Sequence, residues 1–160
     1  MIGKRLGKFE IKAWIGGGQF ADVFLAFDTV VKRDFAIKVS RARERDVKGL
    51  IAEAQVLAAL EHPNIVRFYS ADVIDGRLVI VMEFVEGRSL RSLLDEEGRL
   101  SVPRALSIIY QVLDALEFAH SKGILHRDVK PENILVAQGD RVKLTDFGLA
   151  ALVNPARLSA

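Results

Sequence analysis

The order in which hydrophobic patterns follow one another most constrains the fold of this chain. As far as Ser40, short runs rich in β-branched and aromatic residues alternate with turn residues, which is typical of antiparallel strands. From Arg45 to Glu61 apolar residues recur at helical spacing, and His62-Pro63 ends this pattern. Strand patterns then return, and helical patterns dominate the rest. Strands gathered ahead of helices predict an α+β fold rather than alternating βα units.

Turn and capping residues set the expected boundaries. Asp75-Gly76 favours a hairpin turn, and Ser101 is a good N-cap with Pro103 inside the first helical turn. The expected strands span 9–15, 23–27, 34–40, 64–73 and 77–85, the expected helices 45–61, 87–98 and 101–121, and a last hairpin pairs 133–136 with 141–146. A break near Glu86-Gly87 predicts two lobes, 1–85 and 86–160.

Composition narrows the classes of partner. The chain carries 23 basic and 21 acidic residues, so its net charge of +2 gives no reason to expect nucleic acid as a partner. It contains no cysteine, which suits a reducing compartment, and no run approaches the roughly 20 apolar residues of a membrane span. We expect a cytoplasmic protein with no membrane segment in this chain.

A glycine-rich turn lies between the first two expected strands, in "IGGGQFADV" (15–23). Gly16 and Gly18 stand two apart, with Ala21 where a third glycine would complete a G-x-G-x-x-G pattern. Such a turn is either an ordinary hairpin or a backbone that approaches phosphate closely. A dinucleotide fold would continue as a helix, whereas this chain continues as a strand. The phosphate hypothesis that remains is a glycine flap between antiparallel strands.

Lys38 ends the apolar strand "FAIK", and alone it would be interpreted as a solvated lysine on an edge strand. Beneath a glycine flap it could instead face phosphates, and it would then need an anion to hold its flexible stem. Glu53 is the candidate, because it lies at the edge of the apolar stripe of the 45–61 helix. The functional role of Glu53 depends on that of Lys38.

The segment "ILHRDVKPENILV" (124–136) sets charged residues between apolar runs. The charges nearby are Arg127, Asp128, Lys130, Glu132 and Asp140. Together with "IGGGQFADV", "FAIK", "EHPNIV", "VMEFVEG" and "LTDFGLA", in this order, the segment resembles the eukaryotic-type protein kinase family, in the form common among bacterial serine/threonine kinases. Matches in order along nearly the whole chain make the signal strong.

The resemblance implies a bilobal fold that uses ATP and Mg²⁺ to phosphorylate a protein substrate. It implies that Asp128 accepts the proton of the substrate hydroxyl, that Lys130 neutralises the transferring phosphoryl, and that Lys38 contacts the α- and β-phosphates. Asn133 and Asp146 would hold the metal, since oxygen ligands suit a hard cation. The lysine two places after Asp128 resembles the Ser/Thr-directed members.

Further roles follow from the same resemblance. His126 is expected to pack beneath the loop rather than act as a base, and Arg127 to bind an activation-loop phosphate. Met82 would limit the adenine pocket. The residues implied in nucleotide binding are Ile15, Gly16, Gly17, Gly18, Phe20, Val23, Ala36, Lys38, Glu53, Glu83, Val85 and Leu135.

The resemblance stops after Asp146-Phe147-Gly148, since no Ala-Pro-Glu motif follows. The expected long helix is apolar nearly all round, and a helix of that kind belongs inside a core. Its broad stripe comprises Val102, Ala105, Leu106, Ile109, Val112, Leu113, Leu116 and Ala119, and Ile108, Ala115 and Phe118 add apolar surface on another side. We therefore expect a truncated kinase with part of this helix exposed.

Two functions remain open. The chain is either an ATP-dependent protein serine/threonine kinase, or a catalytically incompetent fragment that binds a nucleotide or a partner. Intact Lys38, Asp128 and Asp146 favour the first, and the short chain favours the second. A small-molecule kinase is disfavoured by Lys130 and the "DFGLA" context.

Overall fold

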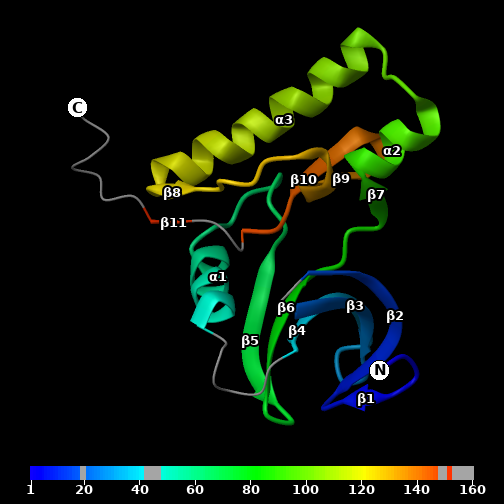
Figure 1. Cartoon of the computed structure of the whole chain (residues 1–160), viewed down its shortest axis with the longest axis vertical. Coiled ribbons are helices and arrows are strands. Elements are labelled where there is room, and N and C mark those ends of the chain that lie inside the picture. The colour runs from blue at the N-terminus through cyan, green and yellow to red at the C-terminus, as the bar shows by residue number, and fades with distance from the viewer. Residues whose placement is uncertain (19–20, 42–47, 148–150, 153–160) are drawn as a thin grey trace. The chain divides into compact units, whose positions relative to one another are not determined.

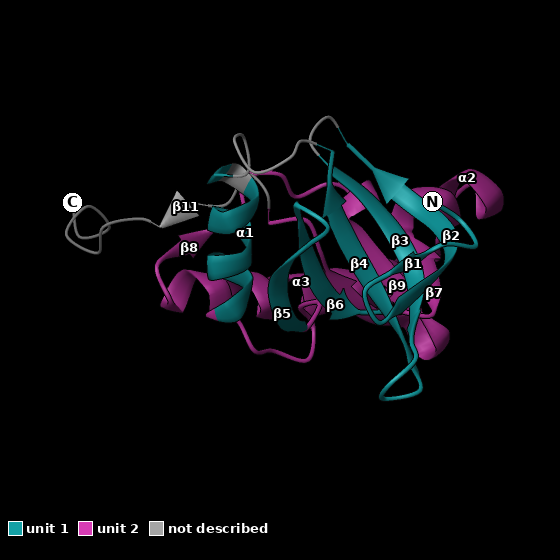
Figure 2. Cartoon of the chain, turned by 90° about the horizontal axis from the view of Figure 1, so that it is seen from below, with its two compact units in different colours: residues 1–58, 68–84 teal, residues 59–67, 85–160 magenta. Residues whose placement is uncertain are grey.

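The computed structural model describes residues 1–18, 21–41, 48–147 and 151–152 (Figure 1). The chain forms two compact units, shown in Figure 2. The first comprises 1–58 and 68–84, and the second comprises 59–67 and 85–160. The segment 59–67 thus belongs with the second unit, whereas the sequence had assigned all of 1–85 to one lobe. Each unit is described by itself.

A six-stranded antiparallel sheet, in the order β1-β2-β3-β4-β6-β5, forms most of the first unit. The strands are β1 (Arg5–Leu6), β2 (Phe9–Gly17), β3 (Ala21–Asp28), β4 (Arg33–Ser40), β5 (Phe68–Ile74) and β6 (Arg77–Glu83), and helix α1 (Lys48–Ala58) contacts β5. Asp75 and Gly76 form the turn between β5 and β6, and both have positive φ, at 51° and 71°. Left-handed backbone at both central positions is what a tight hairpin requires, so the predicted turn is confirmed.

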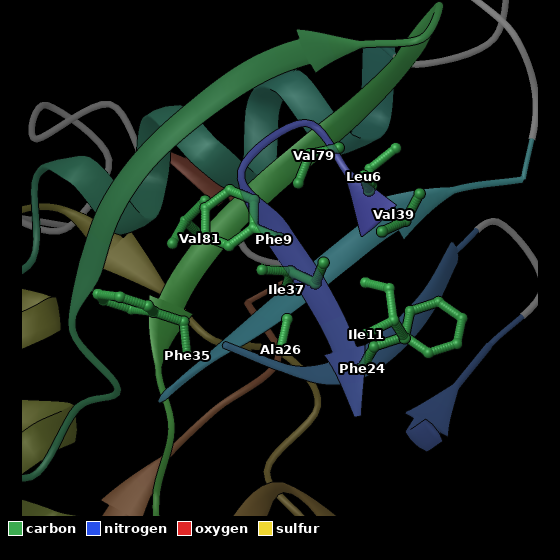
Figure 3. Packing of buried hydrophobic residues seen from close by; sticks show 10 residues of the cluster. All are labelled: Leu6, Phe9, Ile11, Phe24, Ala26, Phe35, Ile37, Val39, Val79 and Val81. Atoms are coloured by element: carbon green, nitrogen blue, oxygen red, sulfur yellow. The ribbon is translucent and has the colours of Figure 1, made fainter. Parts of the chain in front are cut away.

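The curled sheet encloses the core of the first unit (Figure 3). Alternate residues of each strand point inward, as the two-residue period of a strand dictates. The cluster comprises Leu6, Phe9, Ile11, Phe24, Ala26, Phe35, Ile37, Val39, Val79 and Val81. Because this packing fixes the register of β2, β3 and β4, it also fixes where the glycine turn and Lys38 lie.

Among the described residues, two helices and two small sheets, in the strand orders β10-β9-β7 and β11-β8, form the second unit. The helices are α2 (Leu90–Glu97) and α3 (Val102–Ser121), and the strands are β7 (Gly87–Ser89), β8 (Ile124–Leu125), β9 (Ile134–Ala137), β10 (Arg141–Leu144) and β11 (Ala151–Leu152). Two 3-10 turns, η1 (Pro131–Asn133) and η2 (Gln138–Asp140), complete it. β9 pairs with β10 and with β7, so the predicted last hairpin is confirmed.

Capping residues define both helices. The hydroxyl of Ser89 accepts a hydrogen bond from the Ser92 amide, and that of Ser101 accepts one from the Arg104 amide. α2 ends at Gly98, whose φ of 77° suits a residue without a side chain. The predicted boundaries of α3 are therefore confirmed.

Helix α3 buries only one side of the apolar surface that surrounds most of it. Ile108, Val112, Ala115 and Ala119 are buried, and the helix contacts β8 and β10 (Figure 1). Of the predicted stripe only Val112 and Ala119 are buried, whereas Leu106, Ile109 and Leu113 are exposed. The predicted exposure of part of this helix is confirmed. No helix in the described ranges is long and apolar enough to cross a bilayer.

The predicted strand 64–73 begins later than expected, at Phe68. The Val66 amide donates to the Leu144 carbonyl, and the Leu144 amide donates to the Asn64 carbonyl. Pairing with β10 thus takes the start of this apolar run away from the sheet of the first unit.

Candidate active site

The loop 126–130 follows the short strand β8 and carries the densest group of catalytic candidates. The Asp128 carboxylate accepts hydrogen bonds from Lys130 Nζ at 2.8 Å and from Asn133 Nδ2 at 3.0 Å. Asn133 Nδ2 also donates to the Asp128 carbonyl at 2.9 Å. The 3-10 turn at Pro131–Asn133 brings the asparagine back toward the aspartate. The structure therefore brings together three of the residues predicted for the site.

The ionic contact within this group favours the charged forms of both partners. The hydrogen bond from Lys130, with that from Asn133, lowers the pKa of Asp128 below its usual range. The hydrogen bond to Asp128 raises the pKa of Lys130 in turn. Asp128 therefore remains an acceptor, and Lys130 a cation, near neutral pH.

His126 is buried and connects this loop to the segment before Phe147. The Asp128 amide donates to His126 Nδ1 at 3.2 Å, and His126 Nε2 lies 2.9 Å from the Thr145 carbonyl oxygen. Since a carbonyl only accepts, the proton is on Nε2. The ring also packs on Phe147, with centroids 4.5 Å apart. The expected packing role is confirmed, and the histidine in addition orients the Asp128 backbone.

Arg127, within this loop, and Asp146, beyond β10, have left-handed backbone. Arg127 has φ of 65° and Asp146 has φ of 63°, and both are exposed. Such conformations are uncommon outside glycine and cluster where function constrains the chain. The proposed phosphate-binding role of Arg127 stays a prediction.

The fifth charge of the polar segment lies in a different cluster. Asp140, at the end of η2, forms a double hydrogen bond with Arg104 of α3, at 2.9 and 3.0 Å. Its role is to tie the β9–β10 connection to the helix.

Asn133 and Asp146 supply the oxygen atoms that a hard cation prefers. Because Asn133 Nδ2 is bonded to Asp128, its Oδ1 is the atom that could face a metal ion. Asp146 is close enough to Lys130 to raise its pKa, which places the two near the same loop. Among the described residues no group of three or more His, Cys, Asp or Glu could hold a metal. A nucleotide-bound Mg²⁺ needs only one or two carboxylates, so the two residues fit it.

In the first unit, Lys38 and Glu53 form an ion pair. Lys38 Nζ lies 2.7 and 2.6 Å from the two carboxylate oxygens of Glu53. The side chain of Glu53 is 3% exposed and that of Lys38 is 15% exposed. The predicted partnership between β4 and α1 is confirmed.

The three glycines of the turn differ in their surroundings. A Cβ on Gly17 would meet Asp22 Oδ1 at 2.6 Å, whereas no atom of the described chain lies within 4 Å of such a carbon on Gly16 or Gly18. The backbone of these three glycines does not have positive φ. Packing inside the chain therefore explains why residue 17 is a glycine, but it does not explain the glycines at positions 16 and 18. Phe20 lies outside the described residues.

The residues predicted around adenine belong to both units. In the first unit, Val23 lies opposite Lys38, Ala36 opposite Met82, and Glu83 opposite Phe35 at the end of β6. Ile15 is exposed in β2. Val85 and Leu135 belong to the second unit. Their arrangement around a nucleotide stays a prediction.

Several supporting contacts have no signal in the sequence. Asn64 donates to Gln111 Oε1 and to the Val142 carbonyl, which joins the segment 59–67 to α3 and β10. Arg91 of α2 donates to Glu132 at 3.2 Å, beside the loop. Each partner is distant in sequence and belongs to a common polar type, so only the folded chain reveals the pair.

Comparisons with known proteins agree with this geometry. The model of the protein kinase domain matches residues 9–159. The chain is 40% identical to serine/threonine-protein kinase PrkC of Bacillus subtilis (strain 168), over 96% of this chain and 24% of PrkC. It is 35% identical to serine/threonine-protein kinase PknH of Mycobacterium tuberculosis (strain H37Rv), over 99% of this chain and 26% of PknH. It is 37% identical to CBL-interacting serine/threonine-protein kinase 24 of Arabidopsis thaliana, over 93% of this chain and 34% of that kinase.

The chain belongs to the protein kinase family. This confirms the resemblance and, with the observed sheet and helices, the predicted α+β fold. The chain spans about a quarter of the length of the two bacterial relatives.

Proposed function

We propose that this chain takes part in transferring the γ-phosphate of ATP to a serine or threonine hydroxyl of a protein. The observation that carries the proposal is the contact of Asp128 with Lys130 and Asn133 on one loop. Phosphoryl transfer depends on alignment and charge neutralisation, and this group offers a base, a cation and a metal-binding amide together.

Each residue has a distinct part in the proposed reaction. The substrate hydroxyl oxygen forms a bond to the γ-phosphorus, the bond to the ADP oxygen breaks, and Asp128 accepts the hydroxyl proton. Lys130 stabilises negative charge on the transferring group. Lys38, held by Glu53, contacts the α- and β-phosphates. Bound at Asn133 and Asp146, Mg²⁺ would supply further neutralisation of the phosphates.

The glycine turn supports the nucleotide part of the proposal. Gly16 and Gly18 have open space beside them and ordinary φ, so no contact within the described chain requires the lack of a side chain. Close approach by a ligand such as a phosphate would require it. We assign ATP binding to the lobe predicted as 1–85, without the segment 59–67 and Val85 that belong to the second unit, and we assign 86–160 to part of a larger lobe. We place the reaction in the cytoplasm as part of the same proposal.

The direct test is transfer of labelled γ-phosphate from Mg-ATP to a basic acceptor protein. The variants are Asp128→Asn, which keeps the side-chain shape, and Asp95→Asn, which neutralises an exposed carboxylate of α2. Loss of a catalytic base typically lowers a rate by about 10²–10⁴-fold, so we expect a loss of this order in the first variant alone. Equal rates in all three proteins would contradict the role of Asp128.

A second candidate is a fragment that binds nucleotide without transferring phosphate. It is favoured by the exposed apolar residues of α3, which include Leu106, Ile109 and Leu113. Mg-ATP binding to a folded chain that shows no transfer, even with a wide range of acceptors, would support this candidate over the enzyme.

A further inference from the structure

A polar cluster joins three strands at the base of the glycine turn. Asp22, at the start of β3, accepts hydrogen bonds from Arg41 Nε at 3.0 Å and from Arg41 Nη2 at 2.7 Å. The indole Nε1 of Trp14, on β2, donates to the same carboxylate at 3.3 Å. Arg41 directly follows β4. One carboxylate therefore connects β2, β3 and the end of β4.

The cluster is built into the turn itself. Gly17 lies opposite Asp22 in the β2–β3 register, and a Cβ on Gly17 would approach both Asp22 Oδ1, at 2.6 Å, and Trp14 Nε1, at 3.4 Å. The missing side chain of Gly17 thus provides the space that the carboxylate occupies. One residue further, the Gly18 amide donates to the Ala21 carbonyl at 2.9 Å.

The charges in the cluster are complementary. The double hydrogen bond from Arg41 lowers the pKa of Asp22, against a smaller opposing effect of burial, and Arg77 favours the same ionised form. Asp22 is 27% exposed and Arg41 is 52% exposed, so water screens the pair and its effect is modest. A planar guanidinium that binds a carboxylate through two parallel hydrogen bonds nevertheless fixes orientation better than a single contact does.

We propose that Trp14, Asp22 and Arg41 form a clamp that sets the position of the glycine turn, with Asp22 and Arg41 as positioning residues for the nucleotide phosphates. The inference rests on the proposed function, because the turn matters only if it binds a nucleotide. The clamp acts on Gly16 and Gly18 through the strand pairing beside them, and no member of it needs to touch the ligand.

Two substitutions test the clamp with little disturbance of shape. Asp22→Asn retains an acceptor for Trp14 but removes the charge that binds Arg41, and Arg41→Gln removes the guanidinium. The matched control is Asp34→Asn, since Asp34 forms an ion pair with Lys12 at 2.7 Å, with side chains 40% and 43% exposed, on the same sheet. All three variants remove one exposed cross-strand ion pair.

Two measurements separate the clamp from the function that it would serve. Hydrogen exchange of the Gly18 amide reports on the turn without any ligand, and calorimetry reports the Kd for Mg-ATP. We expect Asp22→Asn and Arg41→Gln each to raise both the exchange rate and Kd by about two- to fivefold, in line with an exposed ion pair. The double variant should raise the exchange rate and Kd no further than either single variant does, because both substitutions remove the same contact.

The outcomes are distinguishable. Unchanged Gly18 exchange in both variants, or an equal change in Asp34→Asn, would overturn the clamp. Faster exchange with an unchanged Kd would overturn the positioning role. If the unsubstituted chain does not bind Mg-ATP, both the proposed function and the positioning role are contradicted. Faster Gly18 exchange in the two variants would still establish that the clamp holds the turn in place.

Discussion

At the scale of single residues, two buried carboxylates of the first unit are each paired with a lysine but have different surroundings. Asp28 accepts hydrogen bonds from the amides of Val30 and Val31 and pairs with Lys8. Burial raises its pKa, but the hydrogen bonds from Lys8 and the two amides outweigh this and lower it. Val30 and Val31 belong to the turn between β3 and β4 and Lys8 to the turn between β1 and β2, so Asp28 ties two turns of the sheet together. Glu53 instead projects from a helix to a lysine on a strand.

Removing Lys38 should therefore destabilise the chain. Lys38→Met removes the ammonium group that is paired with the buried Glu53 carboxylate, and we expect the free energy of unfolding to fall by about 3 kcal/mol. Urea denaturation measures the change. Lys12→Met removes an exposed ion pair and should cost less than about 1 kcal/mol. Equal losses in the two variants would mean that Glu53 has adequate partners other than Lys38.

The charge of Asp128 gives a prediction about pH. In Lys130→Gln the pKa of Asp128 should rise toward its ordinary range, because the main cause of its lowering is gone. Since the folded pKa is depressed, the stabilising effect of ionised Asp128 is present above the unfolded pKa and is lost as the pH falls through the folded value. A carbon-detected NMR titration of the carboxyl follows the shift. An unchanged titration would show that the ion pair does not form in solution.

At the scale of elements, a capping residue recognised in the sequence stabilises the start of helix α3. Ser101→Ala removes the side chain that accepts the Arg104 amide, and we expect a loss of about 1 kcal/mol in unfolding free energy. Ser107→Ala, at an exposed position within α3, is the control and should be neutral or slightly stabilising, because alanine is the better helix former. Thermal or urea unfolding compares the two variants, and equal changes in stability would contradict a stabilising role for the Ser101 cap.

What the sequence predicted was mainly what neighbouring residues determine. The longer strands, the Asp75-Gly76 turn, the start of α3 and the pairing of Lys38 with Glu53 all have a local pattern or a motif behind them. The short strands β1, β7, β8 and β11 were not predicted, and β7 occupies residues 87–89 of the expected helix 87–98. The sequence did not determine which face of α3 is buried, because periodicity marks apolar residues without saying which of them meets β8 and β10. The pair of Asp22 and Arg41 depends on strand register, which no short pattern encodes.

At the scale of the whole molecule, one side of α3 presents several large apolar residues to solvent. Its large apolar residues Val102, Leu106, Ile109, Tyr110 and Leu113 are 47% to 72% exposed. Contiguous apolar surface of this kind promotes association. We expect the 160-residue chain to bind the dye ANS and to self-associate as its concentration rises.

Ile109→Glu combined with Leu113→Glu should reduce both effects without unfolding the chain, because neither side chain lies in the core. Analytical ultracentrifugation and dye fluorescence measure them. Val30→Glu with Val31→Glu is a matched control at an exposed apolar turn of the first unit. If only this control lowered association, the chains would associate through the turn and not through the helix.

The path of the chain through its two units limits how the protein can be divided. Residues 59–67 leave the first unit, place Ile65 and Val66 in the interior of the second, and return. A fragment cut after residue 84 would keep this excursion but lose β10, to which it is hydrogen-bonded. A cut between the units after residue 84 will therefore expose Ile65 and Val66 on the N-terminal piece. A cut before residue 59 would keep the segment with β10 but would take β5 and β6 away from the sheet of the first unit, so neither single cut leaves both units whole.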